Sequence, residues 1–243
     1  MMTEFLFFAL VFLLALLYSS VGHGGASGYL ALMALFSFPP DFMRPTALVL
    51  NIFVSSIAFY SFYRGGHFKI KLLLPFIITS LPFAFLGGMI EINPKIYKII
   101  LGLFLLVAVA RMFFNPKYFD GTTKPINQPL ALVIGAVLGL LSGLIGIGGG
   151  IILSPILILL RWADLKQTAA ASAAFIILNS VSGLLGQSTG SLNLAPQSAI
   201  MLVVAILGGI AGSYLGSTKA TGKVLLMALS SVLVFASIKL IFL

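Results

Sequence analysis

Eight stretches of this 243-residue chain carry almost no charged side chain, and the whole sequence is 60% apolar and 8% charged. A soluble domain normally carries about 25% charged residues, and a bilayer-spanning helix needs about 20 mostly apolar ones. The chain is therefore predicted to be an all-α, polytopic protein of a cell inner membrane, crossing the lipid bilayer several times. The stretches are residues 5–17, 47–62, 72–90, 99–109, 130–141, 169–185, 199–215 and 224–238.

The formal net charge of +9 comes mainly from basic residues in short segments between the apolar stretches. Arg64, Lys69 and Lys71 form one such group, and this bias is typical of cytoplasmic loops. No basic face interleaved with aromatic side chains is present, so we expect no nucleic-acid partner. The absence of cysteine excludes disulfides and cysteine-ligated metals, and we expect no cofactor and no metal site.

Two glycine-rich runs, Gly22-His23-Gly24-Gly25 and Gly146-Ile147-Gly148-Gly149, lie 124 positions apart (146 − 22 = 124). The same offset places Gly88 on Gly212. A register kept over this distance indicates a duplicated unit. We therefore expect a first transmembrane repeat at residues 1–114, a cytoplasmic linker at 115–128 and a second transmembrane repeat at 129–243.

Each repeat is predicted to contain five helical segments. We expect about eight to ten of these segments, including short half-helices, to form in the folded chain. The first repeat holds 5–21, 28–38, 45–63, 71–90 and 95–114, and the second holds 129–145, 151–162, 168–187, 196–216 and 222–242. Segments 28–38 and 151–162 follow the glycine runs and, at about 1.5 Å per residue, would cross only about half of a bilayer. The glycine turns are therefore expected near the middle of the membrane.

Loop charge predicts that the two repeats are inserted in opposite senses. The loop with Arg64, Lys69 and Lys71 is strongly basic, whereas its repeat mate, residues 187–194, carries no charge. A basic loop is expected in the cytoplasm and a neutral mate outside it. We therefore expect an inverted-topology repeat, an arrangement typical of secondary transporters.

The glycine runs are the first candidate for a substrate site. Non-helical backbone inside a membrane must be buried in protein or line a polar cavity, and glycine lets such backbone turn sharply. The unpaired N–H groups at the starts of two half-helices could together bind an anion. The alternative role is close helix packing through small residues. The candidate glycines are Gly22, Gly24, Gly25, Gly146, Gly148, Gly149 and Gly150.

Polar side chains near these turns are the second candidate. His23 lies inside the first run, where an imidazole could carry a proton, donate to an oxyanion or serve only local structure. Asn51 and Ser55 share one helix face, and polar residues of segment 168–187 share another, where interhelical hydrogen bonding is the alternative role. The side-chain candidates are His23, Ser27, Asn51, Ser55, Ser172 and Asn179.

All five acidic residues fall at predicted helix ends or in loops, so a buried acid that binds sodium or a proton is not expected. This favours an anionic substrate. One enzymatic alternative exists, because Gly25-Ala26-Ser27-Gly28 matches the GxSG pattern of rhomboid-type intramembrane proteases. These proteases need a histidine base on another helix, and His67 lies in a predicted loop, so we expect no enzymatic activity.

Residues 146–157 read GIGGGIILSPIL and resemble the GxGGGxxxxPxL signature of the TauE/SafE sulfite exporter family. Segments 172–186 and 208–216 resemble the second half of that family, and the resemblance covers essentially the whole chain. It implies secondary transport of small sulfur-containing anions such as sulfite, sulfonates or sulfoacetate, with proton coupling left open. The first run departs from the signature at His23, Ala26 and Ala31, which could tune the substrate or the coupling.

The sequence therefore predicts a membrane transporter that exports small sulfur-containing anions, with its site at the repeat interface near the membrane midplane. One repeat would rock against the other to give alternating access. A passive anion channel with the same site is the alternative. The expected partners are a small anionic substrate and the lipid bilayer, and a homo-oligomer is left open.

Overall fold

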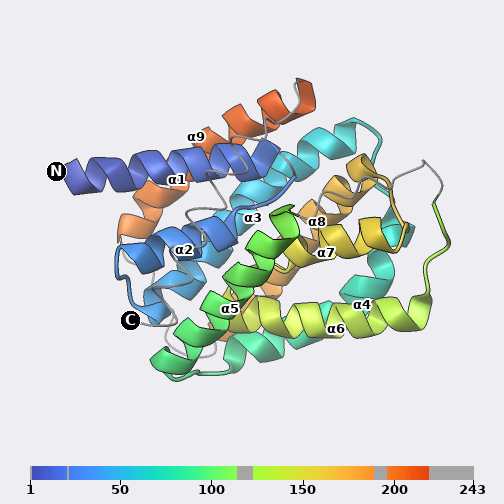
Figure 1. Cartoon of the computed structure of the whole chain (residues 1–243), viewed down its shortest axis with the longest axis horizontal. Helices are drawn as coiled ribbons and strands as arrows, with labels where there is room; N and C mark the ends of the chain where they lie inside the picture. The colour runs from blue at the N-terminus through green and yellow to red at the C-terminus, as the bar shows by residue number, and fades with distance from the viewer. Residues whose placement is uncertain (1, 21, 114–122, 189–195, 219–243) are drawn as a thin grey trace.

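The computed structural model describes residues 2–20, 22–113, 123–188 and 196–218, and all regular structure in these ranges is helical (Figure 1). The first half holds α1 (Met2–Ser20), α2 (Ala26–Leu35), α3 (Pro40–Arg64), α4 (Ile70–Met89) and α5 (Pro94–Phe113). The second half holds α6 (Gln128–Ile145), α7 (Gly150–Leu159), α8 (Leu165–Gln187) and α9 (Pro196–Thr218). The predicted all-α fold is confirmed. The predicted segment 222–242 and residues 115–122 of the predicted linker lie outside the described residues.

Proline sets where three of the long helices begin. Pro40, Pro94 and Pro196 are each the first residue of a helix, a position whose N–H has no helical partner in any case. The predicted start of α3 at residue 45 is wrong, because the helix begins at Pro40 and continues through Pro45. An internal proline removes one helical hydrogen bond without ending the helix here. Arg44 is consequently part of a helix and not of a loop.

The half-helices α2 and α7 contain ten residues each and begin 124 residues apart (150 − 26 = 124). Ten residues rise about 15 Å, roughly half of the hydrocarbon thickness, as predicted. Each helix follows a glycine in the left-handed conformation, Gly25 with φ 93° and Gly149 with φ 73°. Residues with a side chain rarely adopt this conformation, which accounts for glycine at both positions.

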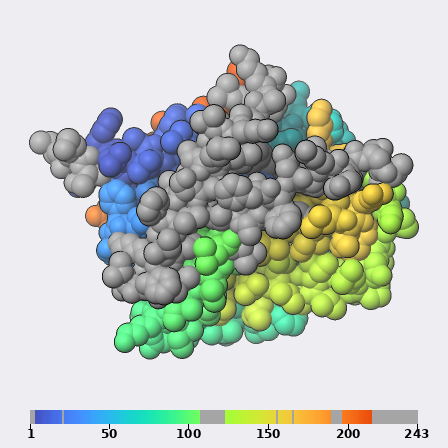
Figure 2. Space-filling model, viewed as in Figure 1, coloured from blue at the N-terminus to red at the C-terminus, as the bar shows by residue number. Residues whose placement is uncertain are grey.

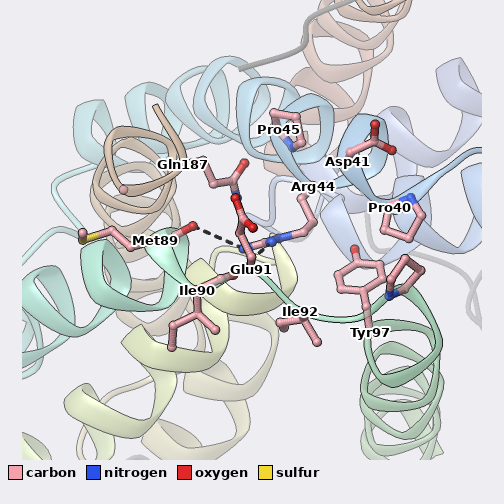
Figure 3. Close-up of a pocket in the computed structure, with 13 residues that line it drawn as sticks. Pro40, Asp41, Arg44, Pro45, Met89, Ile90, Glu91, Ile92, Tyr97 and Gln187 are labelled. Carbon is pink, nitrogen blue, oxygen red and sulfur yellow. Dashed lines mark hydrogen bonds between the residues drawn. The ribbon is translucent and has the colours of Figure 1, made fainter. Parts of the chain in front are cut away.

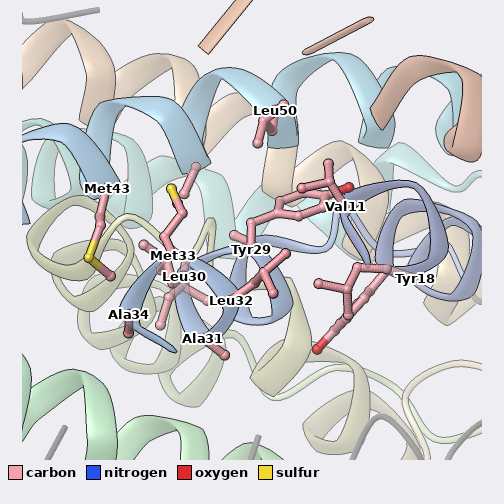
Figure 4. Packing of buried hydrophobic residues seen from close by; sticks show 14 of the residues in the cluster. Val11, Tyr18, Tyr29, Leu30, Ala31, Leu32, Met33, Ala34, Met43 and Leu50 are labelled. Carbon is pink, nitrogen blue, oxygen red and sulfur yellow. The ribbon is translucent and has the colours of Figure 1, made fainter. Parts of the chain in front are cut away.

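Both half-helices also end three residues before their predicted ends, at Leu35 and Leu159. Two residues further on, Ser37 (φ 62°) and Arg161 (φ 58°) are left-handed and turn the chain away from the helix. α2 is buried along nearly its whole length. Figure 4 shows it surrounded by side chains of other helices, among them Val11, Met43 and Leu50.

Glycine lets several long helices approach closely and run in the same direction. α4 lies along α6, because Gly139 faces the Ser80 carbonyl and Gly143 faces the Ala84 carbonyl. In the same way α1 lies along α9, where Gly208 faces the Phe12 carbonyl and Gly212 the Leu16 carbonyl. Small residues at helix contacts are the usual way to pack membrane helices.

The long helices α3 and α8 cross the centre of the molecule in opposite directions. Asn51 hydrogen bonds to Ser180, while Leu48, earlier in α3, meets Gly183, later in α8. α9 instead runs parallel to α3, since Thr46 hydrogen bonds to Ser198 at 2.9 Å and Ser61 hydrogen bonds to Ser213. α8 runs parallel to α4, because the Ser182 hydroxyl donates to the Leu81 carbonyl and Gly186 faces the Phe85 carbonyl.

Within the described ranges, five helices are long and apolar enough to span a membrane, namely α3, α4, α6, α8 and α9. Large apolar side chains stand exposed along several of them, as expected for a surface that contacts lipid. On the face drawn in Figure 2, α1 and α2 form one side of the molecule and α6 and α7 the other. The prediction of a multi-pass membrane protein is confirmed.

Candidate functional site

Asn51 joins the two glycine turns at the centre of the molecule. It lies in α3, is fully buried, and its Oδ1 accepts a hydrogen bond from the Ala26 N–H at 3.1 Å. Its Nδ2 donates to the Ile147 carbonyl at 2.9 Å. One side chain therefore caps the start of α2 and holds the turn before α7.

The glycines on either side of Asn51 leave no room for a side chain. A Cβ on Gly148 would lie 2.6 Å from Asn51 Nδ2 and 3.0 Å from Ser180 Oγ. A Cβ on Gly24 would overlap Asn51 Oδ1 and Ser55 Oγ. The two turns thus contact the polar faces of α3 and α8 directly, and the structure brings Gly24, Gly148, Asn51 and Ser55 together.

A small cavity of about 10 Å³ lies between the turns. Such a volume holds about one water molecule. The cavity would have to widen to admit a larger solute. Its wall is formed by Tyr18, His23, Gly24, Gly25, Ala26, Ser27, Asn51, Ile147, Ile151 and Ile176.

Two hydroxyl groups beside the first turn are buried without a hydrogen-bond partner among the described residues. Ser55 Oγ lies next to Gly24, and the Tyr29 hydroxyl lies next to Gly25. A buried polar group that lacks a partner is unfavourable by about 1–3 kcal/mol, so such groups call for a ligand or another specific explanation. Both hydroxyls can donate a hydrogen bond to an anion.

A chain of three hydrogen-bonded side chains connects the first turn to α7 and α8. His23 Nε2 lies 2.8 Å from Ser154 Oγ, which lies 2.8 Å from Ser172 Oγ. Ser154 Oγ also lies 3.1 Å from the Gly150 carbonyl. When its hydroxyl donates to that carbonyl, His23 and Ser172 must be the donors. The structure brings the predicted residues His23 and Ser172 together through Ser154, which the sequence analysis did not select.

Ser27 and Asn179 form hydrogen bonds that are separate from the chain of His23, Ser154 and Ser172. Ser27 Oγ hydrogen bonds to the Tyr18 hydroxyl at 2.7 Å and lines the cavity. Asn179 Nδ2 donates to the Phe175 carbonyl one turn earlier in α8, and its Oδ1 is buried without a partner. Ser180, the next residue, is the one that meets Gly148, so the contacting position is shifted by one from the predicted residue.

The remaining predicted glycines lie at the ends of the turns. Gly22 (φ 81°) packs against Phe62 and Ala169, and Gly146 (φ 88°) packs against the backbone of Arg44. Gly25 and Gly149 are the N-caps of the half-helices, and Gly150 is the first residue of α7, packed against Ile176. Of the predicted glycines, only Gly24 and Gly25 line the small cavity.

A wider pocket of about 310 Å³, here called the vestibule, lies at the end of the molecule where α3 and α5 begin and α4 and α8 end (Figure 3). Its wall includes Arg44, Glu91, Tyr97 and Gln187. The Tyr97 hydroxyl donates to the Ile145 carbonyl at 3.0 Å, directly before the second turn. This pocket was not predicted from the sequence, where Arg44 fell just outside the expected helical segment 45–63.

The comparisons with known proteins agree with this geometry. The family model described as sulfite exporter TauE/SafE matches residues 7–240. The chain is 37% identical over 235 residues to a probable membrane transporter protein, y4hK, of Sinorhizobium fredii, covering 95% of each chain. It is 26% identical over 225 residues to the probable membrane transporter protein YdhB of Bacillus subtilis, covering 85% of this chain and 86% of that protein.

A third relative is longer than this chain. The probable membrane transporter protein MamO of Paramagnetospirillum magneticum is 26% identical over an alignment of 237 positions that covers 79% of this chain and 37% of MamO. No solved structure matches the chain. The family match over nearly the whole chain, together with the spanning helices and the paired glycine turns, leads to one assignment. The chain belongs to the TauE/SafE sulfite exporter family and is a multi-pass membrane transporter.

Proposed function

We propose that this chain is a secondary transporter that exports small sulfur-containing anions and binds them between the two glycine turns. The observation that carries the proposal is the set of polar groups gathered around Asn51. Ser55 and Tyr29 have buried hydroxyls without partners, and the half-helices α2 and α7 begin beside them. Hydroxyl donors and the positive ends of helices suit a tetrahedral oxyanion. The sulfur-containing substrate is suggested by the description of the family.

Three features support two inverted repeats, at residues 1–114 and 129–243, in this proposal. The half-helices, their left-handed N-caps and the left-handed residues that follow them all keep the offset of 124. Helices α3 and α8 occupy corresponding places and run in opposite directions. The parallel pair α1 and α9 also corresponds to the parallel pair α6 and α4, with one member taken from each half.

The distribution of charge supports an orientation with the linker, residues 115–128, in the cytoplasm. The end of the molecule where α3 ends and α4, α6 and α8 begin carries six described basic residues and one acid. The vestibule end carries three basic and three acidic ones, and the bias of cytoplasmic loops toward basic residues therefore supports a position of this end outside the cytoplasm. The first end holds Arg64, Lys69, Lys71, Lys124, Arg161, Lys166 and Asp164, and the second holds Glu4, Asp41, Arg44, Glu91, Lys95 and Lys98.

The paired half-helices favour a transporter over a passive channel, because repeated broken-helix elements around a central site are typical of alternating-access carriers. The protease alternative receives no support from the contacts of Ser27. Its hydroxyl hydrogen bonds to the phenol of Tyr18 and His23 Nε2 hydrogen bonds to Ser154, so neither contact pairs Ser27 with an imidazole base.

Uptake into proteoliposomes tests the proposal. Purified protein would be reconstituted and assayed with sulfite, sulfate, thiosulfate and small sulfonates, each at two pH gradients of opposite sign. We expect saturable uptake of at least one of these anions, faster into vesicles preloaded with the same anion. Absence of transport for all four classes would contradict the proposed substrate, and saturable flux without acceleration by preloading would favour a channel.

A further inference from the structure

We propose that the vestibule is a second binding site for the anionic group of the substrate, formed by Arg44 and Gln187. The inference rests on the proposed function, because it assumes that the transported solute is a small anion. It adds a binding site outside the cavity between the glycine turns. The volume of about 310 Å³ is sufficient for a small sulfur oxyanion together with water.

The Arg44 guanidinium is held by backbone carbonyls within the described part of the chain. Nη2 lies 3.4, 3.4 and 3.2 Å from the carbonyl oxygens of Gly87, Gly88 and Gly143, and Nη1 lies 3.3 Å from that of Ile90. Carbonyls at helix C-terminal ends carry partial negative charge, which positions a cation without cancelling its full charge. Arg44 Nε is buried and has no hydrogen-bond partner. An attractive site for an anion therefore remains at the wall of the vestibule.

Gln187 supplies a second donor to the same pocket. It is the last residue of α8, and its Nε2 is buried without a partner. Figure 3 shows the Gln187 and Arg44 side chains among the residues that line the vestibule, coming from two different helices. An unsatisfied buried donor is unfavourable, and an oxyanion has enough acceptor oxygens to pair with both.

The Glu91 carboxylate would compete with a substrate anion for these donors. It lies in the connection between α4 and α5, is exposed, and is close enough to Arg44 to attract the guanidinium electrostatically. A substrate anion would take over the role of this carboxylate when it enters, so removing the charge of Glu91 should strengthen anion binding. Asp41 at the first turn of α3 is the other acidic residue of the vestibule wall.

The vestibule contacts the second glycine turn, which connects the two sites. A Cβ on Gly146 would lie 3.1 Å from the Arg44 carbonyl oxygen, and Tyr97 donates to the carbonyl of Ile145. The residue 124 positions after Arg44 is Thr168, which is uncharged, so the fold does not require a cation at this place. A structural role for Arg44 as a cap of α4 would be independent of added anions, and this difference makes the proposal testable.

Anion protection of a single cysteine measures binding in the vestibule. The chain has no cysteine, so Met89→Cys, at an exposed position of the vestibule wall, introduces the only thiol. Its reaction with a membrane-impermeant thiol reagent would be followed in zwitterionic lipid vesicles with increasing sulfate or methanesulfonate, against chloride at equal ionic strength. We expect one of the two sulfur anions to slow the reaction and chloride to have little effect.

Arg44→Gln should raise the protecting concentration about tenfold or more, the loss expected for a charge-assisted hydrogen bond, and Glu91→Gln should lower it severalfold. Lys95→Gln makes the same charge change as Arg44→Gln at the same end of the molecule and should change it less than about twofold. If Arg44→Gln does not fold, Gln187→Leu tests the second donor, with an expected weakening of about threefold to tenfold.

Protection that is unchanged by both Arg44→Gln and Gln187→Leu would overturn the inference. So would a slower reaction caused by anionic lipid and not by the sulfur anions, which would assign the pocket to a lipid headgroup. A wild-type protein that transports an anion without any protection by it would overturn the vestibule site and leave the proposed function standing. A protein that shows neither transport nor protection with any of the anions would overturn both.

Discussion

The two glycine turns share part of their backbone and differ in the rest. Each ends in a left-handed glycine that caps a half-helix, Gly25 in the first turn and Gly149 in the second. The middle glycine of the second turn, Gly148, is also left-handed, whereas its repeat mate Gly24 is not.

The surroundings of the turns differ as well. The first turn begins at Gly22, packed against the apolar side chains of α3 and α8, whereas the second begins at Gly146, packed against Arg44 beside the vestibule. The repeat therefore keeps the glycines that cap the half-helices and changes the side chains that pack against each turn.

The largest effect is expected from adding a side chain to the second turn. Gly148→Ala would introduce a Cβ at φ 77°, 2.6 Å from Asn51 Nδ2. Left-handed backbone strain of about 1–2 kcal/mol would add to an overpacking cost of about 1–3 kcal/mol. We expect transport to fall to background in the proteoliposome assay. The protein should remain monodisperse and unfold at a lower temperature than the wild type.

Gly66→Ala is the matched control, because Gly66 has φ 72° and nothing within 4 Å of the added Cβ. It introduces the same strain without the contact, so transport should stay within about twofold of the wild type. Equal loss of transport in both variants would show that backbone strain alone, and not the packing of the turn on Asn51, explains the effect.

The next largest effect should follow when the link between the turns is removed. Asn51→Leu keeps the size of the side chain but leaves the Ala26 N–H and the Ile147 carbonyl without their partner. Each lost partner is expected to cost about 1–3 kcal/mol, and we expect transport to fall about tenfold or more. Thermal unfolding and initial uptake rates measure the two consequences separately.

Asn127→Ala provides the comparison for this variant. Asn127 also accepts a hydrogen bond from a helix N-terminal N–H, that of Leu130 at 3.1 Å, but at an exposed end of α6. It should lose about 1 kcal/mol of stability and keep its transport rate. If Asn51→Leu transports as fast as Asn127→Ala, the hydrogen bonds of Asn51 to the two turns have only a structural role and the substrate site lies elsewhere.

The first turn differs from the second in carrying His23, and pH dependence tests what this residue does. His23→Gln keeps a hydrogen-bonding group and removes the titration, whereas Ser154→Ala keeps the imidazole and removes its hydrogen bond to Ser154. Among the side chains that line the cavity, Tyr18 is the other titratable one, and only an imidazole titrates near neutral pH. If His23 carries a proton, the rate should become independent of pH between about 5.5 and 7.5 in His23→Gln alone.

Transport rates measured across this pH range in both variants decide the role. Ser154→Ala should keep a pH-dependent rate, lowered about twofold to fivefold by the lost hydrogen bond. The same pH profile in His23→Gln as in the wild type would remove His23 from proton coupling and leave it a role in local structure.

The helices and part of the central site could be predicted from the sequence. The apolar stretches and the offset of 124 gave the helices and the two half-helices, because burial and glycine geometry are local properties of the sequence. The predicted helix starts at residues 95 and 196 lie within one residue of the observed starts at Pro94 and Pro196. Asn51 was selected from its spacing to Ser55, and the structure places both beside Gly24.

The vestibule could not be predicted in this way, since its wall comes from the ends of four helices that are distant in sequence. Arg44 fell outside the predicted segment 45–63, whereas α3 begins at Pro40 and includes it. Ser154 was missed because its role depends on α7 lying beside His23, and helical spacing within one segment contains no information about that contact.

The smallest effect should come from the polar residues of α8 that face the second turn. Ser180 Oγ lies 3.5 Å from Asn51 Nδ2, a weak hydrogen bond, so Ser180→Ala should slow transport by about threefold. Asn179→Leu is the neighbouring control. The Nδ2 group of Asn179 bonds within its own helix, and its unpartnered Oδ1 is an acceptor that cannot bind an anion. We expect less than a twofold change in uptake for Asn179→Leu, and a larger effect there than in Ser180→Ala would mean that α8 turns its Asn179 face to the substrate during transport.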